Sequence, residues 1–169
     1  MKRQLYLRSL RKLIKKYGSD NVIYFDESGF ATHTHRPYAY AKYGTPVFGD
    51  VKGNNYARTN LIMAQRGKEW LAPMLFKGGC HKGVVEAWLE QMLLPELNEP
   101  SLVIMDNASF HDKAAITELL KEKGHTLMPL PPYSPDFNPI EQSFAVIKKR
   151  RICNNLNLEE ILMSHLNLK

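Results

Sequence analysis

Two aspartates in the 169-residue sequence follow short apolar runs, a setting in which carboxylates can bind a metal ion. Asp26 closes residues 21–26 (NVIYFD) and Asp106 closes residues 102–106 (LVIMD), so each is predicted to end a buried strand. If these strands are parallel neighbours, both carboxylates emerge at one sheet edge, within about 5 Å of each other. Their repulsion, about 3 kcal/mol at an effective dielectric constant of ~20, calls for a hard divalent cation, Mg²⁺ or Mn²⁺.

Glu141 is the third candidate ligand. It follows residues 131–137 (PPYSPDF), a stretch that is stiff because each proline fixes its own φ and restricts the residue before it. Such a segment sets the start of the next helix rigidly against the sheet edge. In that helix Asn138 suits the N-cap, Pro139 the first position and Glu141 the third, where its side chain can reach back as in a capping box. Asp136 is predicted to be a turn residue.

Both motifs also have a simpler interpretation. Asp-Glu-Ser-Gly at 26–29 and Asp-Asn-Ala-Ser at 106–109 are good turn sequences, in which each Asp caps its own turn. The matched positions of the two aspartates favour a shared metal site. For Glu141, helix capping and metal binding are compatible and both remain open.

The surrounding pattern predicts an α/β sandwich with a mixed sheet. Residues 66–69 (RGKE) join two apolar runs as a hairpin, and residues 27–29 (ESG) are expected to turn the chain after the first strand. The predicted strands are 21–26, 59–65, 70–76, 102–106 and 126–130, with a short one at 38–43; the predicted helices are 4–17, 82–97, 112–123, 139–152 and 158–166. This order makes the sheet antiparallel at the hairpin and parallel where helices cross over.

The charge is concentrated at the two ends of the chain. Seven of the 23 Lys and Arg lie in residues 1–16, four more form residues 148–151, and residues 20–147 hold 11 basic and 15 acidic side chains. Basic flanks attract a polyanion through phosphate contacts that weaken with salt; the alternative is that they are solvated helix faces. The candidate DNA-binding residues are Arg11, Lys12, Lys15, Lys16, Lys148, Lys149, Arg150 and Arg151.

The chain is expected to act in the cytoplasm, associated with the nucleoid. Its two cysteines, Cys80 and Cys153, form no CxxC pair and suit a reducing compartment. The longest apolar run, 70–76, is too short to span a bilayer. The stripe of apolar residues in helix 4–17 is explained by docking on the domain's own core as well as by a membrane surface, and no membrane partner is expected.

The three acidic motifs together carry a family resemblance. Asp26 in YFDESGF, Asp106 in VIMDNASFH and Glu141 in LPPYSPDFNPIE resemble the DDE endonuclease domain of bacterial insertion-sequence transposases in the Tc/mariner superfamily. Between Asp106 and Glu141 lie 141 − 106 − 1 = 34 residues, a spacing typical of that superfamily. The similarity covers roughly residues 20–151, and the proline-rich motif is its most specific part.

The resemblance implies a ribonuclease-H-like fold, with a mixed five-stranded sheet flanked by helices. It implies that Asp26, Asp106 and Glu141 bind two Mg²⁺ or Mn²⁺ ions, and that the domain cuts element ends in double-stranded DNA and joins them to a target. Two such ions can activate a water or a 3′-hydroxyl and stabilise the leaving oxygen. His111 matches the family's histidine after the second aspartate and, with Asn107, is an auxiliary candidate; a structural role for His111 is the alternative.

Other chemical groupings are weaker. His33 and His35 have the spacing of a zinc pair but lack partner ligands, and Cys80 with His81 offers less.

Relatives of full length carry an N-terminal helix-turn-helix region, and nothing like it fits before residue 20. We therefore expect residues 1–19 to be a basic amphipathic linker helix and residues 20–169 to be the catalytic domain. A helix-turn-helix partner or fusion from an upstream reading frame would supply DNA recognition, and a homodimer is expected in the DNA complex. The alternatives are a truncated transposase that binds DNA as a regulator without cutting, or another ribonuclease-H-like nuclease such as a ribonuclease or junction resolvase.

Overall fold

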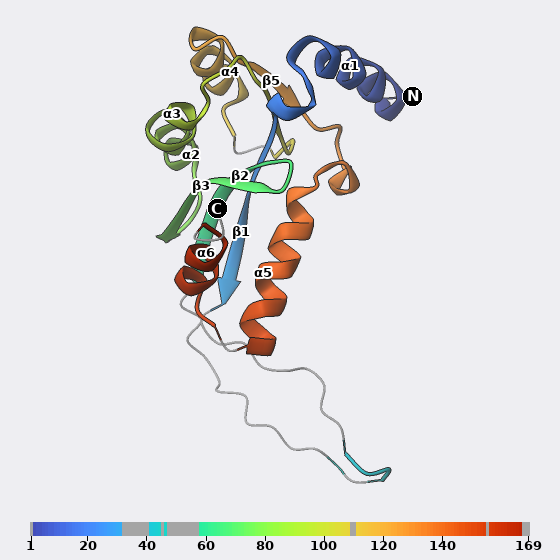
Figure 1. Ribbon diagram of the computed structural model, residues 1–169, viewed down its shortest axis with the longest axis vertical. Coiled ribbons are helices and arrows are strands. Elements are labelled where there is room, and N and C mark those ends of the chain that lie inside the picture. The colour runs from blue at the N-terminus through green and yellow to red at the C-terminus, as the bar shows by residue number, and fades with distance from the viewer. Residues whose placement is uncertain are drawn as a thin grey trace.

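The computed structural model describes residues 2–31, 41–44, 46, 58–108, 111–154 and 156–166. Within them the chain forms a five-stranded sheet in the order β3-β2-β1-β4-β5 (Figure 1). The strands are β1 (Val22–Ala31), β2 (Arg58–Arg66), β3 (Glu69–Lys77), β4 (Leu102–Met105) and β5 (Thr126–Pro129). β1 pairs antiparallel with β2 and parallel with β4, and β4 pairs parallel with β5. The predicted mixed sheet is confirmed.

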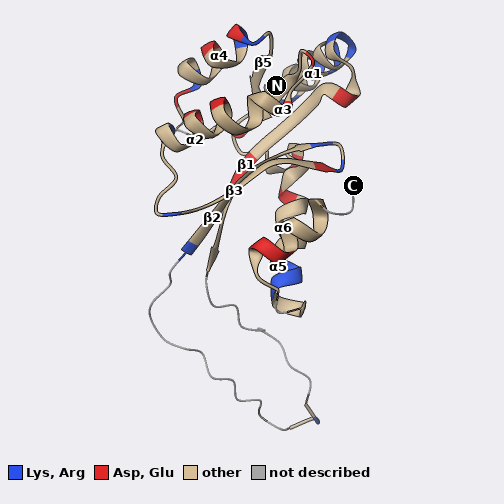
Figure 2. Cartoon of the chain, turned by 60° about the vertical axis from the view of Figure 1, so that its left-hand side comes forward, with Lys and Arg blue, Asp and Glu red and all other residues tan. Residues whose placement is uncertain are grey.

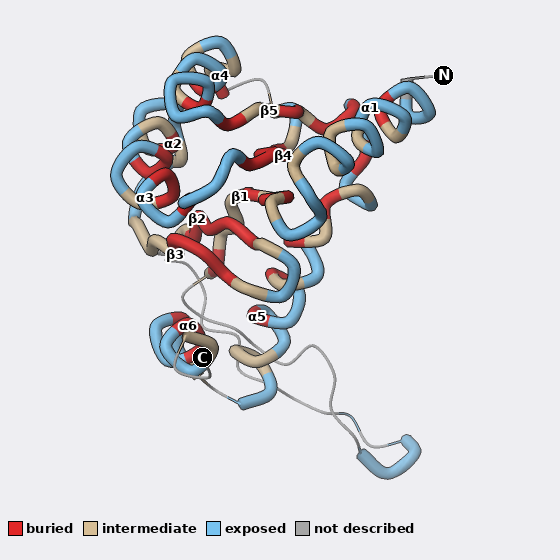
Figure 3. Tube along the Cα trace, turned by 45° about the horizontal axis from the view of Figure 1, so that its top comes forward, coloured by how far each residue is buried: buried red, intermediate tan, exposed pale blue. Residues whose placement is uncertain are grey.

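Helices cover both faces of this sheet, which leaves the strands as the buried middle layer (Figure 3). One face packs against α2 (Lys82–Trp88), η2 (Leu89–Leu93), α3 (Leu94–Glu96) and α4 (Lys113–Glu122). The other packs against α1 (Lys2–Tyr17), α5 (Ile140–Asn154) and α6 (Leu158–Leu166), and the single turns η1 (Ser19–Asn21) and η3 (Pro135–Phe137) complete the elements described. Alternate residues of β1 point to the two faces of the sheet. Ile23 and Phe25 pack on the face covered by α2, α3 and α4, and Val22 and Tyr24 pack on the face covered by α1.

β1 is longer than the sequence pattern predicts. The strand continues through residues 27–29 to Ala31, so the turn predicted there is wrong. The physical reason is pairing, because antiparallel partners on β2 accompany β1 as far as Ala31, where the partner is Arg58. Gly29 serves a close approach instead of a turn, since a Cβ at this position would collide with the Arg58 guanidinium. Asp26 therefore lies in the middle of a strand rather than at its end.

The predicted hairpin of β2 and β3 contains an irregularity that a helix holds in place. The register shifts between Ile62 and Ala64, opposite a stretch of β3 where Ala72 has a φ of 47°. Trp88 Nε1 donates to the carbonyl oxygen of Ala72 at 2.7 Å, and the Ala72 N–H donates to Glu96 Oε1 at 3.1 Å. The segment predicted as one helix over 82–97 thus satisfies backbone groups that the shifted register leaves without a strand partner.

α1 docks on the sheet through the apolar stripe predicted from its sequence. Tyr6 is buried, and Leu7, Leu10, Leu13, Ile14 and Tyr17 pack with it over β4 and β5. The basic residues between positions 8 and 16 of α1 are exposed, and they are Arg8, Arg11, Lys12, Lys15 and Lys16. The stripe is therefore covered by the domain's own core.

The remaining predicted helices are confirmed as α4, α5 and α6. The short strand expected at 38–43 falls mostly outside the described residues, and residues 41–43, which are described, are not in a strand. None of the helices in the described ranges is long and apolar enough to cross a membrane.

Candidate active site

Asp26 and Asp106 lie level with each other on neighbouring parallel strands. β1 pairs with β4 at a constant offset of 80 residues, as for Val22 and Leu102 (102 − 22 = 80). The same offset joins Asp26 to Asp106 (106 − 26 = 80), which comes directly after the last residue of β4. The adjacency predicted for the two strands is confirmed, although β1 continues past Asp26 and β4 ends one residue before Asp106.

The start of α5 brings Glu141 to the same edge, and Asn138 links it to β1. Asn138 Nδ2 donates to Asp26 Oδ2 at 2.9 Å. The Asn138 backbone N–H, which a capping box would offer to Glu141, donates to the carbonyl oxygen of Pro135 at 2.9 Å instead. The predicted capping of α5 by Asn138 and Glu141 is therefore wrong, because Asn138 Oδ1, the atom that would accept from the first turn of α5, has no hydrogen-bond partner.

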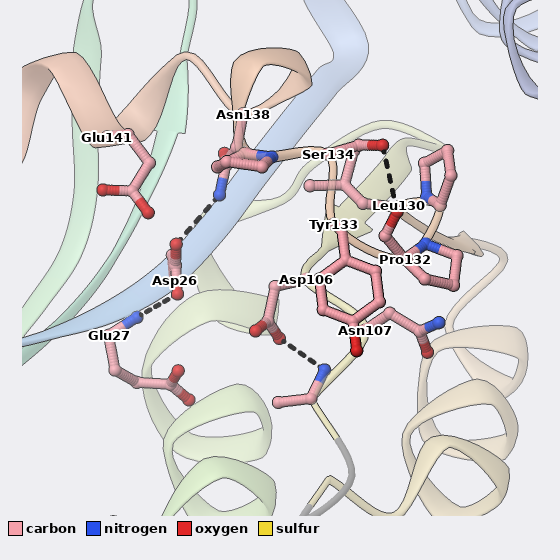
Figure 4. A pocket seen from close by; sticks show the side chains of 13 residues that line it. Asp26, Glu27, Asp106, Asn107, Leu130, Pro132, Tyr133, Ser134, Asn138 and Glu141 are labelled. Atoms are coloured by element: carbon pink, nitrogen blue, oxygen red, sulfur yellow. Dashed lines mark hydrogen bonds between the residues drawn. The ribbon is translucent and has the colours of Figure 1, made fainter. Parts of the chain in front are cut away.

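An open cleft of about 730 Å³ lies at this edge, and all three predicted acids line it (Figure 4). Asp26 comes from β1, Asp106 from the end of β4 and Glu141 from the first turn of α5. The other residues lining it are Glu27, Asn107, Ala108, Leu130, Pro131, Pro132, Tyr133, Ser134, Pro135 and Asn138. Among the described residues that line the cleft there is no Lys or Arg.

Burial and neighbouring groups shift the pKa values of Asp26 and Asp106 in opposite directions. Burial raises the pKa of Asp26 to about 7, and the charges of Glu27, Asp106 and Glu141 add to that effect against a hydrogen bond from the Glu27 N–H. For Asp106, burial also raises the pKa, but hydrogen bonds from His111 and Ala108 outweigh it and the net pKa is lowered. Of these two aspartates, Asp26 is thus the one whose ionised form is less stabilised by the protein.

Buried His111 and partly exposed Glu27 form a pair beside Asp106. His111 Nε2 lies 3.3 Å from Asp106 Oδ1 and 3.6 Å from Glu27 Oε1, and the Cys80 thiol donates to Glu27 Oε1 at 3.7 Å. His111 is only 6% exposed, so it lies behind Asp106 rather than at the cleft surface. Burial and the charge of Asp106 raise the pKa of Glu27, while His111 acts against them.

Sequence reasoning missed Glu27, Asn138 and Tyr133 as residues of the cleft. The sequence pattern assigns Glu27 to a turn and Asn138 to a helix cap, and the alternation of side chains along a longer β1 would be the only signal for Glu27. Because β4 ends at Met105 while β1 continues, successive residues Asp26 and Glu27 both reach the opening although they face opposite sides of the sheet.

The other predicted ligands have different outcomes. Asn107 is exposed and lines the cleft. His33 and His35 lie outside the described residues. Across the part of the chain that the structure describes, no three His, Cys, Asp or Glu side chains are grouped closely enough to hold a metal ion. The three acids nevertheless line one cleft.

The four basic residues at 148–151 do not share one environment, although they follow each other near the end of α5 (Figure 2). Arg151 is half-buried and donates to the carbonyl oxygen of Ala31 at 3.0 Å, with its guanidinium 5.7 Å from the Phe30 ring centre. Lys148 and Lys149 are exposed, and Lys148 also lies 5.7 Å from that ring centre. On α1, the predicted residues Arg11, Lys12, Lys15 and Lys16 are all exposed.

The proline-rich segment is anchored by α1. The Tyr6 ring stacks on Phe137 with centroids 5.7 Å apart, and the Arg3 guanidinium lies 4.4 Å from the Phe137 ring centre. Arg3 also forms an ion pair with Asp136, which lies in the turn η3 as expected. The segment that carries Asn138 and Glu141 is thus fixed from outside the cleft.

Comparison with known proteins shows which family the sequence matches and which solved structures share its fold. A family model described as DDE superfamily endonuclease matches residues 21–166. No curated protein sequence matches the chain. Among solved structures, a Mos1 transposase paired-end complex with the left transposon end has a TM-score of 0.76 at 19% identity, covering 98% of this chain and 52% of that one.

Two further Mos1 structures agree. A mariner paired-end complex with Mn has a TM-score of 0.74 at 18% identity, with coverage of 98% and 52%. The Mos1 mariner transposase catalytic domain has a TM-score of 0.60 at 15% identity, with coverage of 98% and 78%. At these identities the likeness shows the fold, which is that of a ribonuclease-H-like transposase catalytic domain, and the chain spans about half the length of the transposase chains in those complexes.

The family model covers most of the chain, and it includes all three acidic motifs that line the cleft. The chain therefore belongs to the DDE superfamily of endonucleases.

Proposed function

We propose that this chain is the catalytic domain of a transposase that cuts double-stranded DNA at the ends of an insertion sequence and joins the freed ends to a target. The observation that carries the proposal is the meeting of Asp26, Asp106 and Glu141 in one cleft that no described Lys or Arg lines. Carboxylates gathered without a protein cation suit a site that divalent cations complete.

The donor set fits Mg²⁺ or Mn²⁺, and the Mos1 complexes with Mn and Mg support the same choice. Asp26, Asp106 and Glu141 would hold two such ions. When bound, these would supply Lewis-acid activation of a water or 3′-hydroxyl and stabilisation of the leaving oxygen.

The protein's own groups would prepare this site. His111 holds the Asp106 carboxylate from behind at 3.3 Å, and the hydrogen bonds of Asp26 to Asn138 and to the Glu27 N–H fix both of its oxygens. The exposed lysines of α1 and α5 would contact DNA phosphates outside the acidic opening. DNA recognition by a helix-turn-helix partner and assembly as a homodimer on DNA belong to the same proposal.

The test compares wild type with Asp26→Asn, Asp106→Asn and Glu141→Gln on supercoiled plasmid and on duplex, four-way-junction and RNA–DNA hybrid substrates. Each variant should lose Mg²⁺- or Mn²⁺-dependent cleavage and keep salt-sensitive DNA binding. Glu118→Gln, an exposed acid on α4, is the matched control and should cut like wild type.

Three results would count against the proposal. Full cleavage by any one of the three variants would reject the triad. Preference for the junction or hybrid would indicate another nuclease of this fold. DNA binding by wild type without any cleavage would favour the regulator that binds ends without cutting.

A further inference from the structure

Tyr133 is held in a position that its own packing does not explain. Its side chain is 98% exposed, and its backbone has a φ of 54°, in the left-handed region that non-glycine residues rarely adopt. A conformation of this kind costs on the order of 1–3 kcal/mol and persists only where the surroundings impose it. The ring itself buries almost nothing in return.

The neighbours of Tyr133 are what impose this conformation. Ser134 is 4% exposed, and its hydroxyl donates to the carbonyl oxygen of Pro132 at 3.3 Å, closing the backbone around Tyr133. A little further on, Phe137 is stacked on Tyr6. The segment is therefore anchored on the side that follows Tyr133, and the ring projects from a fixed base.

The ring stands on the wall of the cleft that faces the acids. Figure 4 shows it projecting near Asp106 and Asn107, and the lining residues of the stretch 130–135 that carries it are apolar apart from Ser134 and the Tyr133 hydroxyl. They are Leu130, Pro131, Pro132, Tyr133 and Pro135. Asp26, Glu27 and Glu141 lie on the other side, and Asp106 lies between them and the ring. One cleft thus has an acidic side suited to a metal-bound phosphate and an apolar side with one exposed aromatic face.

These observations select a nucleobase as the occupant of the apolar side. A phosphate has no described Lys or Arg to meet within the cleft, whereas the face of a base stacks on an aromatic ring with a gain of about 1–3 kcal/mol. Inside a duplex both faces of a base are already covered by its neighbours. The base must therefore be unpaired or displaced from the helix.

We propose that Tyr133 is a substrate-binding residue whose ring stacks on an unpaired nucleobase next to the phosphate held at the acidic side of the cleft. This inference rests on the proposed function, because it requires DNA in the same cleft. It adds that the cleft prefers DNA with a single-stranded or splayed end over a continuous duplex.

The experiment measures binding of the full chain to two DNA duplexes, with Ca²⁺ in place of Mg²⁺ so that binding is measured without turnover. One duplex ends in a short single-stranded overhang carrying 2-aminopurine, and the other is fully paired with 2-aminopurine inside. Wild type is compared with Tyr133→Phe, Tyr133→Ala and Tyr133→Gly. Tyr43→Ala is the matched control, because Tyr43 is fully exposed and does not line the cleft.

Wild type and Tyr133→Phe should bind the overhang duplex equally and quench 2-aminopurine through stacking. Tyr133→Ala and Tyr133→Gly should bind it about 10-fold more weakly without quenching, as loss of one base stack implies, with affinity for the paired duplex unchanged. Tyr133→Gly should unfold at a midpoint no lower than wild type, because glycine accepts a φ of 54° and the ring it removes is exposed. Weaker binding by a variant of undiminished stability separates a binding role from a folding role.

Equal binding and quenching by wild type, Tyr133→Ala and Tyr133→Gly would overturn the proposal, as would an equal loss in Tyr133→Phe, which would implicate the hydroxyl rather than the ring. If wild type cuts DNA but the Tyr133 variants bind as it does, this inference alone fails. If wild type binds neither duplex, the proposed function fails with it.

Discussion

Asn138 Nδ2 donates a 2.9 Å hydrogen bond to Asp26 Oδ2, so a residue three positions before Glu141 holds the first aspartate of the cleft. Asn138 is 4% exposed, and its Oδ1 has no hydrogen-bond partner. Burying an amide with one atom unsatisfied lowers the stability of the fold. The hydrogen bond to Asp26 therefore explains why Asn138 is buried here. Asn138 couples β1 to the start of α5.

Replacing Asn138 should therefore weaken or strengthen metal binding, depending on whether the new side chain is alanine or aspartate. Asn138→Ala removes the donor that orients Asp26 and should weaken Mn²⁺ binding about 10-fold, the usual effect of losing such a supporting partner. Asn138→Asp adds a carboxylate, which should lower stability without metal and enlarge the stabilisation that Mn²⁺ gives. Calorimetric titration with Mn²⁺ and thermal unfolding with and without the ion measure both effects.

Asn21→Ala is the control, because Asn21 Nδ2 donates a hydrogen bond of the same 2.9 Å length to the carbonyl oxygen of Tyr17, away from the cleft. It should leave Mn²⁺ affinity unchanged. Wild-type Mn²⁺ affinity in both Asn138 variants would show that the contact does not prepare the site.

Two substitutions of Tyr6 should separate packing from hydrogen bonding on α1. The Tyr6 hydroxyl is buried without a partner, so Tyr6→Phe should leave the free energy of unfolding unchanged or raise it slightly. Tyr6→Ala removes the ring that stacks on Phe137 and should lower it by about 3 kcal/mol, as for other buried aromatic residues. Urea unfolding measures both values, and a large loss in Tyr6→Phe would contradict the assignment.

Stability should fall as pH rises because of Asp26. The pKa of its buried carboxyl is raised from 3.8 to about 7, so between these values the folded state binds more protons than the unfolded state. The free energy of unfolding from this group is therefore lost progressively as pH rises from about 4 to 7. The pKa of Glu27 is also raised and acts in the same direction, whereas the lowered pKa of His125 acts against it.

Urea unfolding of wild type and Asp26→Asn at pH 5 and pH 8 in EDTA isolates this contribution. Between these pH values wild type should lose stability relative to the variant, and Mg²⁺ should remove the difference by binding the ionised carboxylate. An identical pH dependence in both proteins would mean that Asp26 titrates normally.

The basic residues of α5 should divide into those that bind DNA and those that hold the fold together. Replacing Lys148 and Lys149 with Ala should weaken DNA binding and reduce the slope of log affinity against log salt by about 0.9 for each phosphate that the variant no longer neutralises. Arg151→Ala should lower thermal stability, because it removes the hydrogen bond to Ala31 and the packing on Phe30, with little change in that slope. Binding titrations over a range of salt concentrations and thermal unfolding test the division, and an unchanged slope in the double variant would refute it.

Local pattern in the sequence determined the elements and the two aspartate strands. The stripe of α1, the hairpin and the starts of α5 and α6 follow from periodicity, glycine and proline, which act between residues close in the chain. The equal settings of Asp26 and Asp106 also indicated their adjacency, because parallel strands bring matched positions to one edge.

The tertiary structure alone decided the partners of the site residues. β1 runs past Asp26 because β2 pairs with it, and Asn138 serves Asp26 across 112 residues rather than capping its own helix. His111 turns to Asp106 and Glu27 in the same way. A side chain with several possible hydrogen-bond partners takes the one that the folded chain brings within reach, and that choice depends on contacts between segments that no local pattern encodes.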